Sequence, residues 1–153
     1  MLKTIPKNWL TWNCDVEENN SFVGKLEFSW RDTTGKILTQ KSDYRVRYKG
    51  LLAVKFFFDN YENRLGYAEM ANPLIRVVKL NYAETQYQLK AASMFSKKFI
   101  LQQKKQTLGI IDSKNILDRQ AIIDLPTTLP LEFRLFVTWI VLWFWRRSER
   151  NIT

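Results

Sequence analysis

The 153-residue chain contains no histidine. Histidine is the usual general base near neutral pH and the commonest metal ligand, so sites that depend on it are excluded. A single cysteine, Cys14, lies between Trp12 and Asp15, and no histidine can activate it as a nucleophile. We therefore interpret Cys14 as a small buried residue. The sequence predicts no catalytic residue, no cofactor and no metal, and a protein that is not an enzyme.

Other common site motifs are also missing. Five scattered glycines form no loop that could cradle a phosphate. The acidic cluster of Asp15, Glu17 and Glu18 lacks the spacing and the glycine of a calcium loop, so we expect a solvated loop there. Asp59 and Asp112 each follow an apolar run. We expect both to begin turns by accepting hydrogen bonds from nearby backbone NH groups.

The length and the cysteine content set the broad class. At 46% hydrophobic residues, the chain can bury one core, so we expect a single domain over residues 1–153. A lone cysteine cannot form an internal disulfide, and the first residues lack the apolar core of a signal peptide. We therefore expect a reducing, cytoplasmic location.

Strand patterns dominate the chain before residue 126. "KLEFSWR" at 25–31 and "YRVRYKG" at 44–50 alternate apolar and charged residues, which is typical of strands with one solvated face. Trp30, Tyr44 and Tyr48 fall on the apolar side and should face inward. Polar turn sequences separate the strand-like runs, so neighbouring strands should be antiparallel. We expect ten to twelve strands between about residues 9 and 125, and the remaining runs are 51–59, 65–71, 74–80, 85–92, 97–103, 108–113 and 119–125.

A faint internal repeat supports these hairpins. In each copy, a large apolar residue in a strand is followed, across a polar turn, by a glycine that opens the return strand. The three pairs are Phe28 with Gly35, Phe58 with Gly66, and Leu101 with Gly109.

The C-terminal segment "LPLEFRLFVTWIVLWFWRRSER" at 129–150 predicts a helix. Pro126 and Pro130 stop the last strand, Thr128 or Leu129 can cap the helix, and Pro130 and Glu132 fit its first turn. The arginines that close the segment suit the negative end of the helix dipole. They are Arg146, Arg147 and Arg150.

This predicted helix has no polar face. From Leu135 to Trp145 the only polar side chain is Thr138, so the helix must be buried on all sides, in protein or in lipid. A spanning helix needs about 20 apolar residues, and charged Glu132 and Arg134 interrupt any extension of this shorter run. A tail-anchored protein remains an alternative, with the closing arginines as its cytoplasmic flank.

We favour a closed barrel as the structure that buries this helix. A barrel of about twelve strands leaves a lumen wide enough for a helix, and three tryptophans can fill it if their indole NH groups find partners inside. These are Trp139, Trp143 and Trp145. The predicted fold is therefore mainly β, a closed antiparallel barrel of about twelve strands that encloses a hydrophobic C-terminal α-helix over roughly 129–147.

Three segments resemble the tubby-like superfamily, which includes the LURP-one-related proteins and the phospholipid scramblases. They are "FFFDNYENRLGYAE", "KKFILQQKKQTLGIID" and "DRQAIIDLPTTLPLEFRLFVTWIVLWFW", and the likeness covers roughly residues 20–147. The resemblance implies a twelve-stranded barrel around a C-terminal helix, although for scramblases this helix is also proposed as a membrane anchor. It implies functions in phosphoinositide binding or lipid movement. The scramblase calcium motif has no counterpart here, and the phosphoinositide site of tubby has no residue-by-residue match.

Positive charge supplies the candidate site. The net charge of +9 and the pI near 9.7 favour anionic partners. Two groups of basic residues could form a patch for anionic headgroups if they meet on the barrel. Each basic residue near an anionic membrane surface adds about 1 kcal/mol to the free energy of binding. Alternatively, these basic residues only provide the polar side chains that a solvent-exposed sheet face requires. Arg45, Arg47 and Lys49 share one strand face, and Lys97, Lys98, Lys104 and Lys105 flank one predicted hairpin.

These observations predict a non-enzymatic binding module. We expect it to bind anionic phospholipids, phosphoinositides in particular, at a membrane surface through its outer wall. The alternatives are a cytoplasmic protein–protein adaptor and the tail-anchored protein. Nucleic acid is a less favoured partner, because the sequence has no helix-turn-helix, zinc knuckle or recognition helix.

Overall fold

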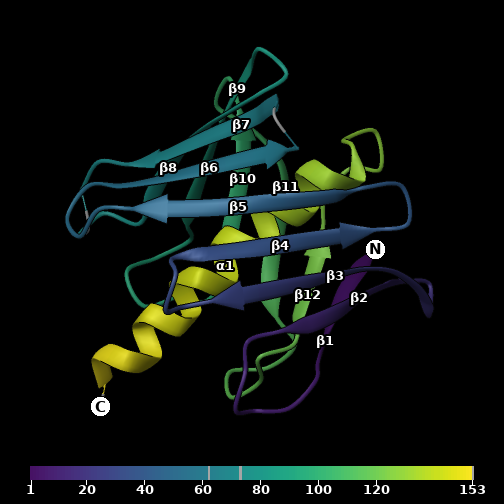
Figure 1. Ribbon diagram of the computed structural model, residues 1–153. Coiled ribbons are helices and arrows are strands. Elements are labelled where there is room, and N and C mark those ends of the chain that lie inside the picture. The colour runs from purple at the N-terminus through teal and green to yellow at the C-terminus, as the bar shows by residue number, and fades with distance from the viewer. Residues whose placement is uncertain (62, 73, 153) are drawn as a thin grey trace.

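The structure, a computed structural model, describes residues 1–61, 63–72 and 74–152 (Figure 1). Each strand pairs antiparallel with its neighbours in sequence order, and β1 pairs with β12 to close the sheet. The closed antiparallel barrel is thus confirmed. Over the described residues the strands are β1 (Leu2–Pro6), β2 (Cys14–Glu18), β3 (Ser21–Ser29), β4 (Thr34–Thr39), β5 (Asp43–Lys49), β6 (Val54–Asn60), β7 (Asn63–Met70), β8 (Val77–Tyr82), β9 (Thr85–Ala91), β10 (Phe99–Gln103), β11 (Gln106–Ser113) and β12 (Ala121–Asp124).

The first two strands differ from the prediction. The strands begin at Leu2, not near residue 9, because β1 is needed to bridge β2 and β12. The acidic cluster lies in β2 and not in a solvated loop. Cys14 and Val16 point into the core, while Asp15 alternates with them and lies within 3.9 Å of the Lys7 ammonium. Asp15 and Glu17 therefore lie on the outer face of a short strand, while Glu18, the cross-strand partner of the buried Leu2, reaches the buried Arg134. The strand gave little apolar signal because it contributes only two buried hydrophobic residues.

The single helix of the described residues, α1, spans Leu131–Ile152. It begins after Pro130 rather than including it, because the carbonyl of Pro130 accepts the first helical hydrogen bonds from the N–H groups of Phe133 and Arg134. The helix also continues beyond the predicted end at residue 147. Its last turns, which carry the closing arginines, therefore project past the apolar segment.

The barrel encloses the apolar part of α1 (Figure 1). Every residue from Phe133 to Trp145 is buried, as the lack of a polar face predicted. The indole NH of Trp139 donates to the carbonyl of Glu27 at 3.0 Å, and that of Trp145 donates to the carbonyl of Lys97 at 2.9 Å. Among the described residues, no helix has the length and apolar character that would let it cross a membrane.

The charged residues at the start of α1 find partners in the barrel. The hydroxyl of Tyr82 donates to Glu132 at 2.8 Å, and burial together with this carboxylate raises the pKa of Tyr82. The buried Arg134 donates through Nε to the carbonyl of Leu129 at 3.0 Å, and its Nη1 lies 3.4 Å from a carboxylate oxygen of Glu18. The two charges that break the apolar run are therefore paired where the helix enters the barrel.

The glycine repeat marks three hairpins, as predicted, and the structure supplies its reason. In each copy the large residue and the glycine are direct partners across neighbouring strands. A Cβ at Gly35 would lie 2.5 Å from the Trp139 ring, and one at Gly66 would lie 3.6 Å from Phe136. Glycine at position 35 therefore leaves room for Trp139 of the central helix, whereas a Cβ at position 66 would only touch the helix.

Candidate functional site

The two ends of the barrel are built differently. Because the strands follow one another around the barrel, alternate connections lie at opposite ends. At one end, called the far rim, Asn19–Asn20, Ala83–Glu84 and Lys104–Lys105 form two-residue turns with both residues at positive φ. The opposite end, from which the last turns of α1 project, has connections of four to seven residues. This helix-exit rim comprises 7–13, 30–33, 50–53, 71–72 with 74–76, 92–98 and 114–120.

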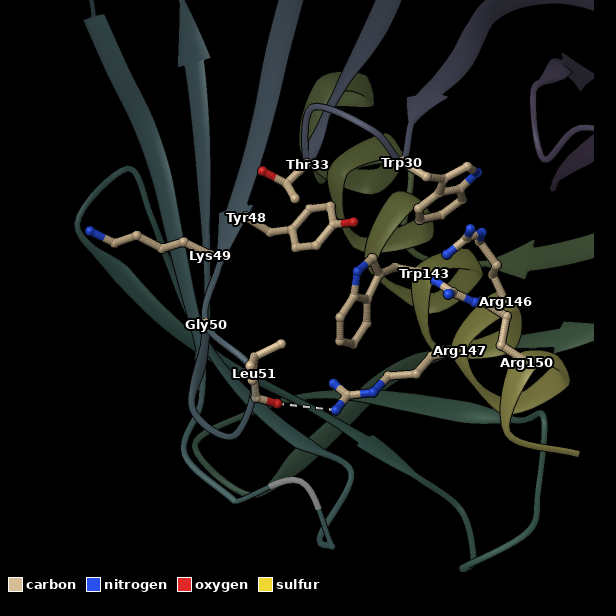
Figure 2. Close-up of a pocket in the computed structure, with 10 residues that line it drawn as sticks. All are labelled: Trp30, Thr33, Tyr48, Lys49, Gly50, Leu51, Trp143, Arg146, Arg147 and Arg150. Carbon is tan, nitrogen blue, oxygen red and sulfur yellow. Dashed lines mark hydrogen bonds between the residues drawn. The ribbon is translucent and has the colours of Figure 1, made fainter.

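A hollow of about 660 Å³ lies on the helix-exit rim beside the end of α1 (Figure 2). We call it the rim pocket. The connection between β3 and β4, the end of β5 with its following loop, and the last turns of α1 all contribute to it. Its lining residues are Trp30, Thr33, Tyr48, Lys49, Gly50, Leu51, Trp143, Arg146, Arg147 and Arg150.

Two of the helix arginines are held in place. The guanidinium carbon of Arg146 lies 3.6 Å from the centre of the Trp30 ring. Arg147 lies over Trp143 at 5.1 Å and donates from Nη2 to the carbonyl of Leu51 at 3.1 Å. Burial and the neighbouring charge of Arg150 lower the pKa of Arg146. Like charges therefore crowd one wall of the pocket, an arrangement that an anion would stabilise.

Aromatic rings form the rest of the wall. Trp30 stacks on Phe28 with 5.1 Å between ring centres, and Phe28 in turn stacks on the buried Trp139 at 4.6 Å. Tyr48 meets Trp143 edge to face at 5.7 Å. Because these contacts tie the lining rings to the barrel core, the pocket has a preformed wall.

The chemistry of the pocket suits a phosphate group. Guanidinium groups present planar N–H donors that match phosphate oxygens, often in pairs. The described lining residues include four basic side chains and no carboxylate. The C-terminal end of a helix carries the equivalent of roughly −0.5 charge, which opposes an anion, but three arginines on the last turns outweigh it. The charged side chains that line the pocket are therefore all positive.

The predicted group on β5 has the expected orientation. Arg45, Arg47 and Lys49 are exposed on its outer face. Lys49 lines the rim pocket, but Figure 2 shows its side chain pointing away from the arginines. Arg47 lies 3.5 Å from Asp59, which also pairs with Arg64 at 2.9 Å. The charge of Arg47 is thus partly neutralised.

Both predictions about turn-forming aspartates need correction. Asp59 lies within β6, and its carboxylate holds two arginines on the outer face of the sheet instead of capping a turn. Asp112 lies within β11 and accepts a hydrogen bond from the backbone N–H of Ser113 at 2.8 Å. Its partner is a nearby N–H, as expected, but the strand continues past it.

The two predicted basic groups do not meet. In the closed strand order β5 and β10 lie across the barrel from each other. Lys97 and Lys98 precede β10, whereas Lys104 and Lys105 follow it at the far rim, where they line a separate hollow of about 370 Å³ with Lys79. Lys97 donates to the carbonyl of Asp118 at 3.1 Å, and burial lowers its pKa. The predicted residues are therefore spread over three regions.

The residues that sequence reasoning missed are the closing arginines, which were assigned to the helix dipole or, in the tail-anchored alternative, to a cytoplasmic flank. The sequence did contain a signal for this site. Basic residues that directly follow a buried apolar helical segment must lie at the rim where that segment leaves the barrel. Comparison of the chain with family models, curated proteins and solved structures found no match.

Proposed function

We propose that this protein is a non-enzymatic module that binds the headgroups of anionic phospholipids, phosphoinositides in particular, in the rim pocket. The observation that carries the proposal is that Arg146, Arg147 and Arg150 line one preformed hollow with Trp30 and Trp143. The proposal moves the site from the outer wall of the barrel to its helix-exit rim. A cytoplasmic location, inferred from the lone cysteine, is part of the proposal.

The architecture supports this choice over a tail anchor. An anchor needs the apolar part of α1 in lipid, but Phe133 to Trp145 lie inside the barrel. A barrel that encloses a C-terminal helix is also what the resemblance to the tubby-like superfamily implies, and we include membership of that superfamily in the proposal. The rim pocket favours this function over the protein-adaptor alternative, since its like charges suit a compact anion.

Flotation of the full-length chain with vesicles tests the proposal. Vesicles of phosphatidylcholine with a few per cent phosphatidylinositol bisphosphate should bind the chain, and pure phosphatidylcholine vesicles should bind it much less. Three triple variants that each remove three positive charges then locate the site. They are Arg146→Gln with Arg147→Gln and Arg150→Gln; Arg45→Gln with Arg47→Gln and Lys49→Gln; and Lys79→Gln with Lys104→Gln and Lys105→Gln.

The rim-arginine variant should lose the most binding. Because each charge near an anionic surface contributes about 1 kcal/mol, loss of three corresponds to roughly a hundredfold change, and direct headgroup contacts should add to it. The same variant should lose affinity for soluble inositol hexakisphosphate in calorimetric titration. Equal losses in all three variants would show a diffuse electrostatic attraction, and the pocket would not be the site.

A further inference from the structure

We propose that the helix-exit rim is a membrane-docking surface whose loop tips enter the interfacial region of an anionic bilayer. This inference rests on the proposed function and extends it from a bound headgroup to a whole surface. It gives the barrel one orientation, with the rim pocket facing the lipid and the far rim directed into solvent.

Exposed apolar pairs stand on five of the six connections of the helix-exit rim. Of the thirteen large hydrophobic side chains that are exposed among the described residues, ten belong to these pairs, with exposed fractions of 56% to 95%. Scattered single apolar residues need no explanation, but segregation of this kind to one end marks an interaction surface. The tip pairs are Trp9–Leu10, Leu51–Leu52, Leu74–Ile75, Met94–Phe95 and Ile116–Leu117.

Three of the tips share a turn that is closed by an asparagine side chain. In each, an asparagine Oδ1 accepts a hydrogen bond from the backbone N–H of the leucine two residues later. Such turns fix the local backbone of a loop. The pairs are Asn8 with Leu10, Asn72 with Leu74, and Asn115 with Leu117, at donor–acceptor distances of 2.9, 2.9 and 3.2 Å.

Arginine side chains donate hydrogen bonds to backbone carbonyl groups of rim loops that carry the tip pairs. Arg119 donates to the carbonyl of Trp9 at 2.8 Å, and Arg147 donates to that of Leu51 at 3.1 Å. Arg76 donates to the carbonyls of Ser93 and Met94 at 2.6 and 2.7 Å. Backbone groups beside the tips are thus held by the rim, so the apolar side chains are displayed in a defined geometry.

The charge of the chain is concentrated at the same end. The six connections, counted as 7–13, 30–33, 50–53, 71–76, 92–98 and 114–120, together with 146–152, hold ten lysines and arginines against three acidic residues. That is a net charge of +7 out of +9 for the chain. Anionic lipid surfaces attract such clusters, and the attraction adds to the burial of apolar side chains.

This combination fits a bilayer better than a protein. The buried core of a protein–protein interface is depleted in charged residues. Here the apolar pairs stand on separate loops around a cluster of arginines, so a protein partner would have to bury those charges to reach all five tips. A bilayer can take the tips into its apolar boundary while its phosphates remain level with the arginines.

Removing the tips tests the proposal separately from the pocket. The variant Leu10→Ser with Phe95→Ser and Leu117→Ser changes three loops that contribute no lining residue to the rim pocket. Its binding to phosphatidylinositol bisphosphate vesicles should fall by at least about tenfold, because full burial of a single such side chain corresponds to roughly a ten- to hundredfold change. Its affinity for inositol hexakisphosphate should stay within about twofold of the parent.

A matched control removes exposed apolar side chains elsewhere. Tyr61→Ser with Phe22→Ser changes side chains that are 85% and 45% exposed and lie outside the helix-exit rim. Vesicle binding by this variant should match the parent. An environment-sensitive fluorophore on Leu117→Cys should shift to shorter wavelength with vesicles, whereas the same label on Lys104→Cys at the far rim should not.

The outcomes separate the two proposals. If the tip variant and the parent bind vesicles equally, or if the label at residue 117 stays in water, insertion is wrong and the rim is a protein-docking surface. If the rim-arginine variant keeps its affinity for inositol hexakisphosphate but the tip variant loses vesicle binding, the headgroup pocket is wrong and insertion stands.

Discussion

The guanidinium group of Arg146 lies 3.6 Å from the centre of the Trp30 ring, which joins the last turns of the helix to the connection between β3 and β4. The stack continues inward through Phe28 to Trp139 at the centre of the barrel. A residue of the proposed headgroup site is thereby coupled to the packing of the core.

A double-mutant cycle should measure this coupling. With Trp30→Leu and Arg146→Gln, the free energies of unfolding in urea should show an interaction of about 0.5–1 kcal/mol, the range for a cation–π contact that is partly exposed. The comparison pair is Trp30→Leu with Lys104→Gln at the far rim, whose effects should add. An additive result for Arg146 as well would mean that the contact contributes nothing to stability.

Gly35 should be intolerant of even one added methyl group. The Cβ of Gly35→Ala would lie 2.5 Å from the Trp139 ring and 2.6 Å from the carbonyl oxygen of Glu27. Overpacking of this kind costs roughly 1–3 kcal/mol, and we expect the upper end because backbone as well as ring must move. Gly66→Ala meets its nearest atom at 3.2 Å and should cost less. Urea titration of both variants gives the comparison, and equal losses would contradict it.

Most of the architecture could be predicted because it follows from two periodicities. The alternation around Trp30, Tyr44 and Tyr48 predicted one inward face, and all three residues pack against the core. The absence of a polar face on the tail predicted its enclosure. The missed strands, β1 and β2, are five residues each and contribute few inward side chains, so their pattern could not be told from a loop.

The site was less accessible to sequence reasoning. The rim pocket joins residues near 30, 50 and 146, which are distant in sequence and meet only when the barrel closes. Two apolar tips were also hidden inside longer apolar runs. Leu51 and Leu74 were assigned to strands, but β6 begins at Val54 and β8 at Val77. The recurring asparagine two residues before a leucine was the available signal for three of the tips.

Two truncations should separate folding from binding. Removal of residues 130–153 takes the helix out of the lumen, and loss of each large aromatic side chain from a core costs roughly 3–5 kcal/mol, so the barrel should unfold or aggregate. Removal of 146–153 deletes the three arginines but retains Phe133 to Trp145, which fill the lumen in the full chain. That shorter form should keep its circular dichroism spectrum and cooperative thermal unfolding but lose binding to anionic vesicles. A folded chain without residues 130–153 would contradict the role of the helix as core.

The buried Cys14 thiol should make stability depend on alkaline pH. Burial, with a smaller contribution from Asp15, raises the pKa of Cys14 to about 12. The unfolded thiol ionises near pH 8.5, so above this pH the folded state binds more protons than the unfolded state. The stabilisation is fully present below about pH 8.5 and is lost as the pH rises toward 12, at about 1.4 kcal/mol per pH unit.

The variant Cys14→Ala tests this prediction. Its free energy of unfolding in urea should fall less steeply with pH between pH 9 and pH 11 than that of the parent, because tyrosines and lysines titrate equally in both proteins. Native protein at pH 8 should also react with a thiol reagent only as fast as it unfolds. Equal slopes for the two proteins, together with rapid reaction of the native thiol, would show that Cys14 is accessible.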